Sequence, residues 1–197
     1  MAPVPGLEDL RLYSAHPASR LGELVGGDAS PYWAFSWAGG LALARYLTAN
    51  PQTVAGRRVV DLGSGSGLVA IAAARAGAAS VVAVDIDRHA VAAVALNAAL
   101  NGVTVMTLLT DATGGPPPDA DVVLAGDVFY SPEVAQTTGP FLQRCADAGL
   151  AVLIGDPGRA FLPSTGLAIV AKDEVGDFAG GSATMPAFVY QMEPTTA

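Results

Sequence analysis

The feature that most constrains the fold is a regular alternation of short apolar runs with helical runs through the middle of the chain. Strands are expected over residues 58–62, 81–84, 103–109, 121–125 and 150–154. Helices are expected over residues 41–47, 67–76, 88–100 and 132–148. Because crossover helices join parallel strands, this alternation predicts an α/β fold with a Rossmann-like, doubly wound and mostly parallel sheet.

The last part of the chain breaks this rhythm. Residues 167–175 and 187–193 both have strand-like sequences with no convincing helix between them, so the sheet is expected to end in an antiparallel hairpin. No internal repeat is present, and nothing indicates a second domain. We therefore expect a single domain with an N-terminal extension over residues 1–30, a cofactor-binding core over 31–159 and a C-terminal hairpin over 160–197.

Composition narrows the possible partners. The 197 residues include 10 Lys and Arg against 18 Asp and Glu, without a basic cluster, so nucleic-acid binding is not expected. No apolar segment approaches the roughly 20 residues needed to span a bilayer, so no membrane partner is expected either. The first residues lack the basic start of a signal peptide, and the single cysteine, Cys145, fits a reducing compartment. These features predict a cytoplasmic location.

A glycine-rich turn follows the first expected core strand. Glycines occupy positions 63, 65 and 67, directly before a helix whose first N–H groups are free. Glycine allows positive φ angles and lets a ligand approach the backbone closely, so the turn is expected to bind a cofactor. One interpretation is a dinucleotide, because Gly65 to Ala70 fits the G-x-G-x-x-A pattern and Asp85 lies at the expected offset for a ribose contact.

Two details favour S-adenosylmethionine instead. In dinucleotide-binding folds the first glycine closely follows the strand, whereas here Asp61, Leu62 and Gly63 intervene before Gly65. A carboxylate at Asp61 would repel a pyrophosphate but suits the positive sulfonium and amino groups of S-adenosylmethionine. The turn resembles the Asp-x-Gly-x-Gly-x-Gly signature of class I methyltransferases. That resemblance implies a donor site, with no metal, formed by Asp61, Gly63, Ser64, Gly65 and Gly67.

Further donor-binding positions follow from the same resemblance. Asp85, at the end of the second core strand, is implied to accept hydrogen bonds from both ribose hydroxyls. Ile86 is implied to lie beside the donor, and Asp111 with Ala112 is implied to contact adenine. A plain turn remains an alternative for Asp111, and Asp87 is interpreted as the N-cap of the following helix.

Three more segments narrow the resemblance. Residues 31–40 are rich in aromatic side chains, Gly126 to Tyr130 end the fourth core strand, and Ile154 to Arg159 end the fifth. Over residues 31–159 the chain resembles the lysine methyltransferases of the electron transfer flavoprotein β-subunit. The resemblance implies protein-lysine N-methylation of that β-subunit, through an exposed Lys/Arg-rich loop of the substrate that suits an acidic enzyme.

This second resemblance also implies roles for residues at the donor site and on the acceptor side. Trp37 is implied to line the donor site. Asp127 is expected to orient the substrate ammonium and help it lose its proton, while Phe129 and Tyr130 wall the target channel. A strand-end cap remains an alternative for Asp127, and simple packing of the loop remains one for Trp33.

Parts of the sequence depart from that family. Little room is left for a helix between Phe161 and Gly166, and residues 188–193 replace the usual Trp-containing last strand. Asp156 and Arg159 either touch the substrate or form an ordinary turn. Because these regions help to choose substrates, a ribosomal protein or a small amine stays open as the acceptor. More remote interpretations are an NAD-binding dehydrogenase and a non-catalytic module that only binds the donor.

Overall fold

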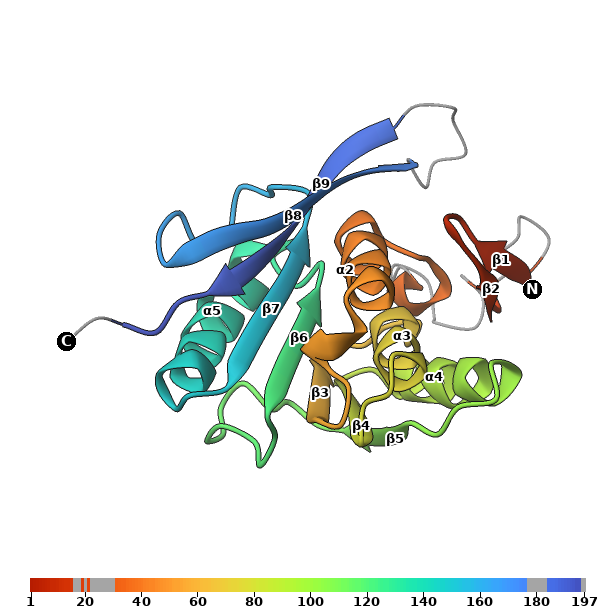
Figure 1. Cartoon of the computed structure of the whole chain (residues 1–197), viewed down its shortest axis with the longest axis horizontal. Helices are drawn as coiled ribbons and strands as arrows, with labels where there is room; N and C mark the ends of the chain where they lie inside the picture. Colours follow the sequence, from red (N-terminus) through yellow and green to blue (C-terminus); the bar gives the residue numbers. More distant parts are fainter. Residues whose placement is uncertain (16–18, 20, 22–30, 177–183, 196–197) are drawn as a thin grey trace.

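The computed structural model describes residues 1–15, 19, 21, 31–176 and 184–195 (Figure 1). Within these residues, seven strands form one sheet in the order β5-β4-β3-β6-β7-β9-β8. Their bounds are β3 Arg58–Leu62, β4 Ser80–Asp85, β5 Met106–Leu109, β6 Val122–Gly126, β7 Ala151–Asp156, β8 Leu167–Gly176 and β9 Thr184–Met192. Strands β3 to β7 pair in parallel, and β9 runs antiparallel to both of its neighbours. The expected α/β sheet with a terminal antiparallel hairpin is therefore confirmed.

Helices cover the two faces of this sheet unequally (Figure 1). The helices are α2 Ala38–Ala49, α3 Leu68–Arg75, α4 Arg88–Leu100 and α5 Pro132–Asp147. Alternate residues of β6 separate the faces, because Leu124 packs with α2, α3 and α4 whereas Val123 packs with α5. Within the described part of the chain, no helix has the length and apolar character needed to cross a membrane.

Most element boundaries agree with the expected ones, and the differences have local causes. β5 begins at Met106 and not at residue 103, because the N–H of Val103 donates to the carbonyl of Ala98 and closes α4. At the other end of that helix, the side chain of Asp87 accepts a hydrogen bond from the N–H of His89. Asp87 is thus the N-cap that the sequence indicates.

The N-terminal extension contains a β-hairpin. β1 Ala2–Val4 pairs antiparallel with β2 Leu7–Leu12. Leu10 and Leu12 are buried in the same core as α2, α3 and α4. The hairpin therefore packs on the face of the domain that these three helices cover (Figure 1).

Helix α2 and strand β7 approach so closely that only glycine fits where they meet. A Cβ atom on Gly39 would lie 2.1 Å from the carbonyl oxygen of Gly155, and one on Gly155 would lie 2.1 Å from the carbonyl oxygen of Gly39. Because protein interiors are close-packed, either side chain would push the helix away from the sheet. This contact brings the start of α2 next to the carboxyl ends of β6 and β7.

Gly39→Ala is expected to lower the free energy of unfolding by about 2 kcal/mol or more, because its methyl group would overlap a backbone carbonyl. Gly114→Ala is the matched control, since nothing lies within 4 Å of its Cβ position. The control should change the free energy of unfolding by less than about 1 kcal/mol. Urea unfolding of both variants measures these values, and equal stability of Gly39→Ala and wild type would contradict the tight contact.

Candidate functional site

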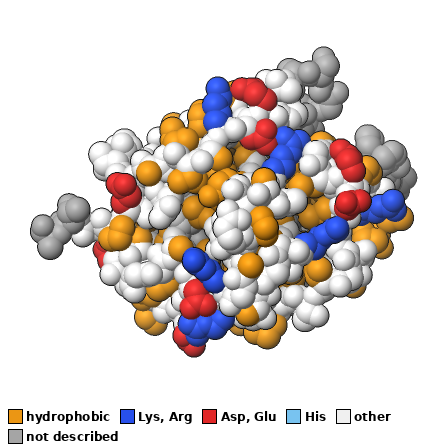
Figure 2. All heavy atoms as spheres, viewed as in Figure 1, with side chains coloured by type: hydrophobic (Ala, Val, Ile, Leu, Met, Phe, Trp, Pro, Cys, Tyr) orange, Lys and Arg blue, Asp and Glu red, His pale blue; other side chains and the backbone are white. Residues whose placement is uncertain are grey.

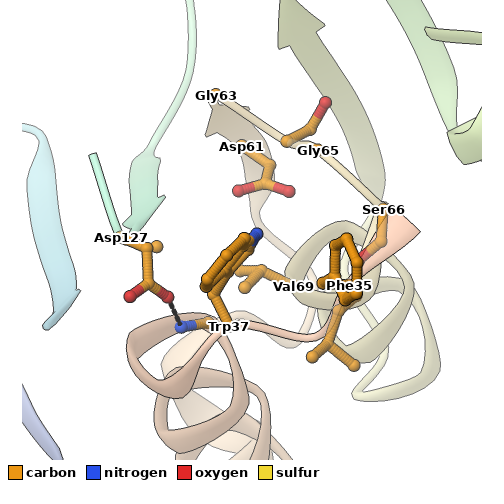
Figure 3. Close-up of a pocket in the computed structure, with 12 residues that line it drawn as sticks. Phe35, Trp37, Asp61, Gly63, Gly65, Ser66, Val69 and Asp127 are labelled. Atoms are coloured by element: carbon orange, nitrogen blue, oxygen red, sulfur yellow. Dashed lines mark hydrogen bonds between the residues drawn. The ribbon is translucent and has the colours of Figure 1, made fainter. Parts of the chain in front are cut away.

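The glycine-rich turn lies at the carboxyl ends of the parallel strands, beside a hollow in the surface (Figure 3). Residues from β3, from β6 and from the starts of α2 and α3 meet there. The hollow is lined by Phe35, Trp37, Gly40, Asp61, Gly63, Ser64, Gly65, Ser66, Leu68, Val69, Gly126 and Asp127. Because open α/β sheets bind ligands outside the carboxyl ends of their strands, this hollow is the candidate functional site.

Three positive φ angles shape the glycine-rich turn. Gly63, Gly65 and Gly67 have φ values of 65°, 51° and 82°. Residues with a side chain rarely adopt such angles, and a Cβ atom on Gly67 would also lie 3.2 Å from Val94 of α4. Gly67 directly precedes α3, so the turn leads the chain into that helix. The spacing of the glycines therefore corresponds to a tight turn along the hollow.

Asp61 is the most deeply buried charged residue of the hollow. Its exposed fraction is 1%, and one carboxylate oxygen accepts a 3.0 Å hydrogen bond from the N–H of Ala70 in α3. Among the described residues, no cation forms an ion pair with it. Burial raises the pKa of Asp61 to about 8, although the bond from Ala70 lowers it, and the charge of Asp85 raises it further. A positively charged group in the hollow would stabilise this carboxylate.

Asp85 holds the same turn from the end of β4. One carboxylate oxygen accepts a 2.9 Å hydrogen bond from the N–H of Gly65, and the other accepts a 2.9 Å bond from the N–H of Asp87. Each oxygen of a carboxylate has a second lone pair, so Asp85 can accept further hydrogen bonds from a ligand.

Asp127 faces the hollow from the position directly after β6, the strand next to that of Asp61 (Figure 3). It is the one described non-glycine residue with a positive φ, 59°. One carboxylate oxygen accepts a 2.6 Å hydrogen bond from the N–H of Gly40, and the other pairs with the guanidinium of Arg159 at 2.5 Å. Burial raises the pKa of Asp127, whereas Arg159 and Gly40 oppose that rise. Such strained backbone angles are concentrated at functional sites.

Arg159 joins the ends of two strands. Its guanidinium also contacts the carboxylate of Asp156 at 3.2 Å. Asp156 is fully buried, and its other oxygen accepts hydrogen bonds from the N–H groups of Gly158 and Arg159. Asp156 therefore forms the ordinary turn that the sequence left as an alternative, and this turn places Arg159 beside Asp127.

Aromatic side chains from residues 31–37 border the hollow. Phe35 and Trp37 line it, with ring centroids 5.7 Å apart. The Nε1–H of Trp37 donates a 2.9 Å hydrogen bond to the carbonyl of Tyr32, whose ring stacks on Tyr130 at 5.7 Å. Because Tyr32 and Tyr130 are about half exposed, they offer a solvent-facing aromatic surface next to Trp37.

The structure brings some of the expected site residues together and places others elsewhere. Those that line the hollow are Trp37, Asp61, Gly63, Ser64, Gly65 and Asp127. Those that do not line it are Gly67, Asp85, Ile86, Asp111, Ala112, Phe129 and Tyr130. Asp85 and Gly67 still shape the turn, and Tyr130 contacts the aromatic segment.

Three residues that the sequence singled out lie in surroundings other than the hollow. Phe129 does not wall an open channel, because its ring is fully buried in the core that α5 covers. Asp111 forms a plain turn, in which one carboxylate oxygen accepts hydrogen bonds from the N–H and hydroxyl of Thr113. Trp33 stacks on His89 of α4, with ring centroids 6.0 Å apart, which corresponds to its packing alternative.

Sequence reasoning missed half of the lining residues, and some of them had a signal. The missed residues are Phe35, Gly40, Ser66, Leu68, Val69 and Gly126. Phe35 and Trp37 have extended backbone angles. Alternate residues of an extended segment point to the same side, so the expected position of Trp37 in the hollow was also a signal for Phe35. Gly40 and Gly126 had no local signal: a Cβ atom on Gly126 would lie 2.9 Å from the Cα of Gly40, a proximity that only the folded chain creates.

Comparisons with known proteins agree with this architecture. Residues 45–128 match the family described as ribosomal protein L11 methyltransferase (PrmA). The electron transfer flavoprotein β-subunit lysine methyltransferases of Danio rerio and Homo sapiens are 49% and 44% identical to the chain over 132 and 133 residues, covering 66% of this chain and 51% of each relative. The structure of magnesium protoporphyrin IX methyltransferase from Synechocystis has a TM-score of 0.58 at 16% identity, over 92% of this chain and 93% of that one.

These similarities differ in what they show. The chain spans about half the length of the curated relatives it matches. At 16% identity, the Synechocystis structure supports the fold alone. The match over residues 45–128 includes the glycine-rich turn, Asp85 and Asp127. By its sheet topology the chain has the fold of class I, seven-β-strand methyltransferases, and its sequence is similar to methyltransferases over residues 45–128.

Proposed function

We propose that the chain is an S-adenosylmethionine-dependent methyltransferase. The observation that carries this proposal is the buried carboxyl group of Asp61, which lines the hollow beside the glycine-rich turn. S-adenosylmethionine bears positive charge on its sulfonium and amino groups, whereas the pyrophosphate of NAD is an anion. A buried acid without a cation partner among the described residues suits the first ligand and disfavours the second, so Asp61 argues against the dehydrogenase alternative.

Separate residues suit separate parts of the donor. Asp61 would accept hydrogen bonds from the amino group, and Asp85 would accept them from the ribose hydroxyls with its remaining lone pairs. Ile86, which is 72% exposed, would offer apolar surface to the adenine together with Ala112. Asp111 uses one carboxylate oxygen in its turn and is the proposed polar contact there through the other. When bound, the donor supplies a methyl group on a positively charged sulfur, which is activated for in-line displacement.

Ser64 gives an independent indication of a polar ligand. Its hydroxyl oxygen is buried in the hollow and has no hydrogen-bond partner among the described residues. Buried hydroxyl groups in folded proteins almost always have a partner, because an unpaired one costs free energy. A donor molecule in the hollow would provide that partner.

For the acceptor, we propose a lysine of a protein, with the electron transfer flavoprotein β-subunit as the substrate. Relatives with that name share 44–49% identity with the chain. A lysine ammonium has a pKa of about 10.4 in water and must lose a proton before it attacks. Asp127 would orient this ammonium and favour its deprotonation, and the exposed rings of Tyr32 and Tyr130 would pack against the aliphatic part of the lysine.

Other acceptors are weighed against this one. A ribosomal protein is the second candidate, because the matching family is described as a ribosomal protein L11 methyltransferase, and a small amine is a third. A nucleic acid fits less well: on the face in Figure 2, the basic side chains of the described residues lie singly, several of them next to acidic ones. The proposed location is the cytoplasm, supported by Cys145, a buried thiol without a disulfide partner.

Donor binding is the first expected outcome. Calorimetry should show binding of S-adenosylhomocysteine to the wild-type chain and no binding of NAD. Asp85→Asn should weaken this binding about 10- to 100-fold, because charge-assisted hydrogen bonds to the ribose and to the turn are lost. The matched control is Asp119→Asn, an exposed residue that pairs with Arg58 at the other end of the strands. Binding of NAD alone would overturn the proposal.

Methyl transfer is the second expected outcome. Labelled donor should methylate purified β-subunit on lysine, and Asp127→Asn should lower kcat about 100-fold with little change in S-adenosylhomocysteine affinity. Asparagine tolerates the positive φ of this position, so the backbone is preserved. Lys172 is the single lysine of the chain, and Lys172→Arg therefore removes self-methylation as a source of label.

A parallel labelling of whole lysate identifies the acceptor if it differs. Label on another protein, with none on the β-subunit, would reject the proposed substrate but keep the proposed reaction. Absence of label from both samples, despite donor binding, would favour the module that only binds the donor.

The stability of the free protein should depend on pH through Asp61. Its pKa is raised to about 8 in the folded state, from 3.8, so the folded state holds a proton that the unfolded state releases. Stability should therefore fall as pH rises from about 4 to about 8, by a few kcal/mol in total, and level off above that. Asp61→Asn should reduce this slope and weaken donor binding, whereas Asp111→Asn should leave the slope between about pH 5 and pH 8 unchanged. Urea unfolding across this range measures it, and an unchanged slope in Asp61→Asn would contradict the assignment.

A further inference from the structure

Side chains of α3 and α4 complete the open edge of the N-terminal hairpin. Arg75 donates a hydrogen bond to the carbonyl of Asp9. Asn101 accepts a 3.0 Å bond from the N–H of Arg11 and donates a 2.7 Å bond to its carbonyl. Alternate residues of a strand present their backbone groups to the same edge, so these side chains replace a neighbouring strand beside β2.

Asn97, one helical turn before Asn101, extends this row and also reaches the glycine-rich turn. Its Oδ1 accepts a 2.8 Å hydrogen bond from the N–H of Tyr13, and its Nδ2 donates a 2.8 Å bond to the carbonyl of Ser66. The side chain is fully buried. A backbone N–H on one side and a carbonyl on the other define its amide orientation. One buried side chain therefore links the end of β2 to a residue that lines the hollow.

We propose that Asn97 is a positioning residue of the donor site, and that it makes donor affinity depend on the docked N-terminal hairpin. The inference rests on the proposed binding of S-adenosylmethionine in the hollow. Asn97 does not line the hollow, so its effect passes through the conformation of the turn. The hairpin would act as part of the donor site although it lies outside it.

The carbonyl of Ser66 depends on Asn97 because helix α3 does not supply a donor for it. Ser66 precedes the N-cap Gly67, and the first hydrogen bond of the helix runs from the N–H of Ile71 to the carbonyl of Gly67, so the helical ladder does not include the Ser66 carbonyl. Within the described part of the chain, the bond from Asn97 is the one that the Ser66 carbonyl accepts. Gly67 follows with a φ of 82°, so no side chain restrains this peptide group.

A second contact ties the hairpin to the aromatic border of the hollow. The N–H of Ala15, just beyond β2, donates a 2.9 Å hydrogen bond to the carbonyl of Ala34. The neighbouring Trp33 stacks on His89, which belongs to α4 like Asn97. The end of β2, the aromatic segment and the glycine-rich turn are thus all fastened to one helix.

The test compares Asn97→Ala with Asn101→Ala in the full chain. Asn97 lies in α4 and bonds to Tyr13 just beyond β2, whereas Asn101, the C-cap of α4, bonds to Arg11 of β2. Only Asn97 bonds to the turn, so Asn101→Ala leaves the link from Tyr13 to Ser66 in place. The dissociation constant of S-adenosylhomocysteine, measured by calorimetry, should rise about tenfold in Asn97→Ala and stay within about twofold in Asn101→Ala. At saturating donor, kcat should be unchanged, and hydrogen exchange over residues 63–67 should increase only in Asn97→Ala.

Tyr13→Pro tests the hairpin end of the same link. It removes the N–H that bonds to Asn97 and leaves the glycine-rich turn untouched, and the preceding residue is a strand residue that tolerates a following proline. This variant should weaken donor binding about three- to fivefold. If Asn97→Ala fails to fold, Tyr13→Pro against Asn101→Ala decides the same question.

Two results would overturn the inference: equal donor affinities of Asn97→Ala and Asn101→Ala, or a wild-type affinity of Tyr13→Pro. Thermal unfolding of the free proteins gives the Tm of each variant. Each protein is titrated well below its own Tm, so a loss of donor affinity does not come from general destabilisation. Failure of the wild-type chain to bind S-adenosylhomocysteine would instead reject the proposed donor site itself. The two failures are therefore distinguishable.

Discussion

Three carboxylates at neighbouring strand ends hold the candidate site together. Asp61, Asp85 and Asp127 each accept a hydrogen bond from a backbone N–H: the first from α3, the second from the glycine-rich turn and the third from α2. N–H groups in the first turn of a helix have no partner within the helix, and a carboxylate both satisfies them and matches the helix dipole. The relative positions of two helices and one turn therefore depend on these acids.

The same acids differ in how their charge is balanced. Asp127 pairs with Arg159, so its negative charge is compensated within the protein. Among the described residues, the N–H of Ala70 is the one hydrogen-bond donor to Asp61 and no cation pairs with it, and burial raises the pKa of Asp61 to about 8. An uncompensated buried charge opposes folding. The chain thus retains at Asp61 a group that weakens the free protein and suits a cationic ligand, which is a common compromise between stability and function.

The site also depends on contacts made far from it. The close approach of Gly39 and Gly155 sets the start of α2 against the ends of β6 and β7, and this is what allows Gly40 to reach Asp127. On the other side, Asn97 connects the N-terminal hairpin to Ser66. The hollow is therefore one end of a rigid network, and substitutions well outside it should alter its shape.

The sequence by itself determined the order of the elements, the glycine-rich turn and most of the acids around the hollow. Periodicity and glycine spacing are local properties, so they are visible without the fold. Only the tertiary structure decided that Phe129 points into the core, that Arg159 pairs with Asp127 32 residues away, and that Asn97 contacts Tyr13 84 residues away. Contacts between residues distant in sequence leave no periodic signal, because they arise only when packing brings separate elements together.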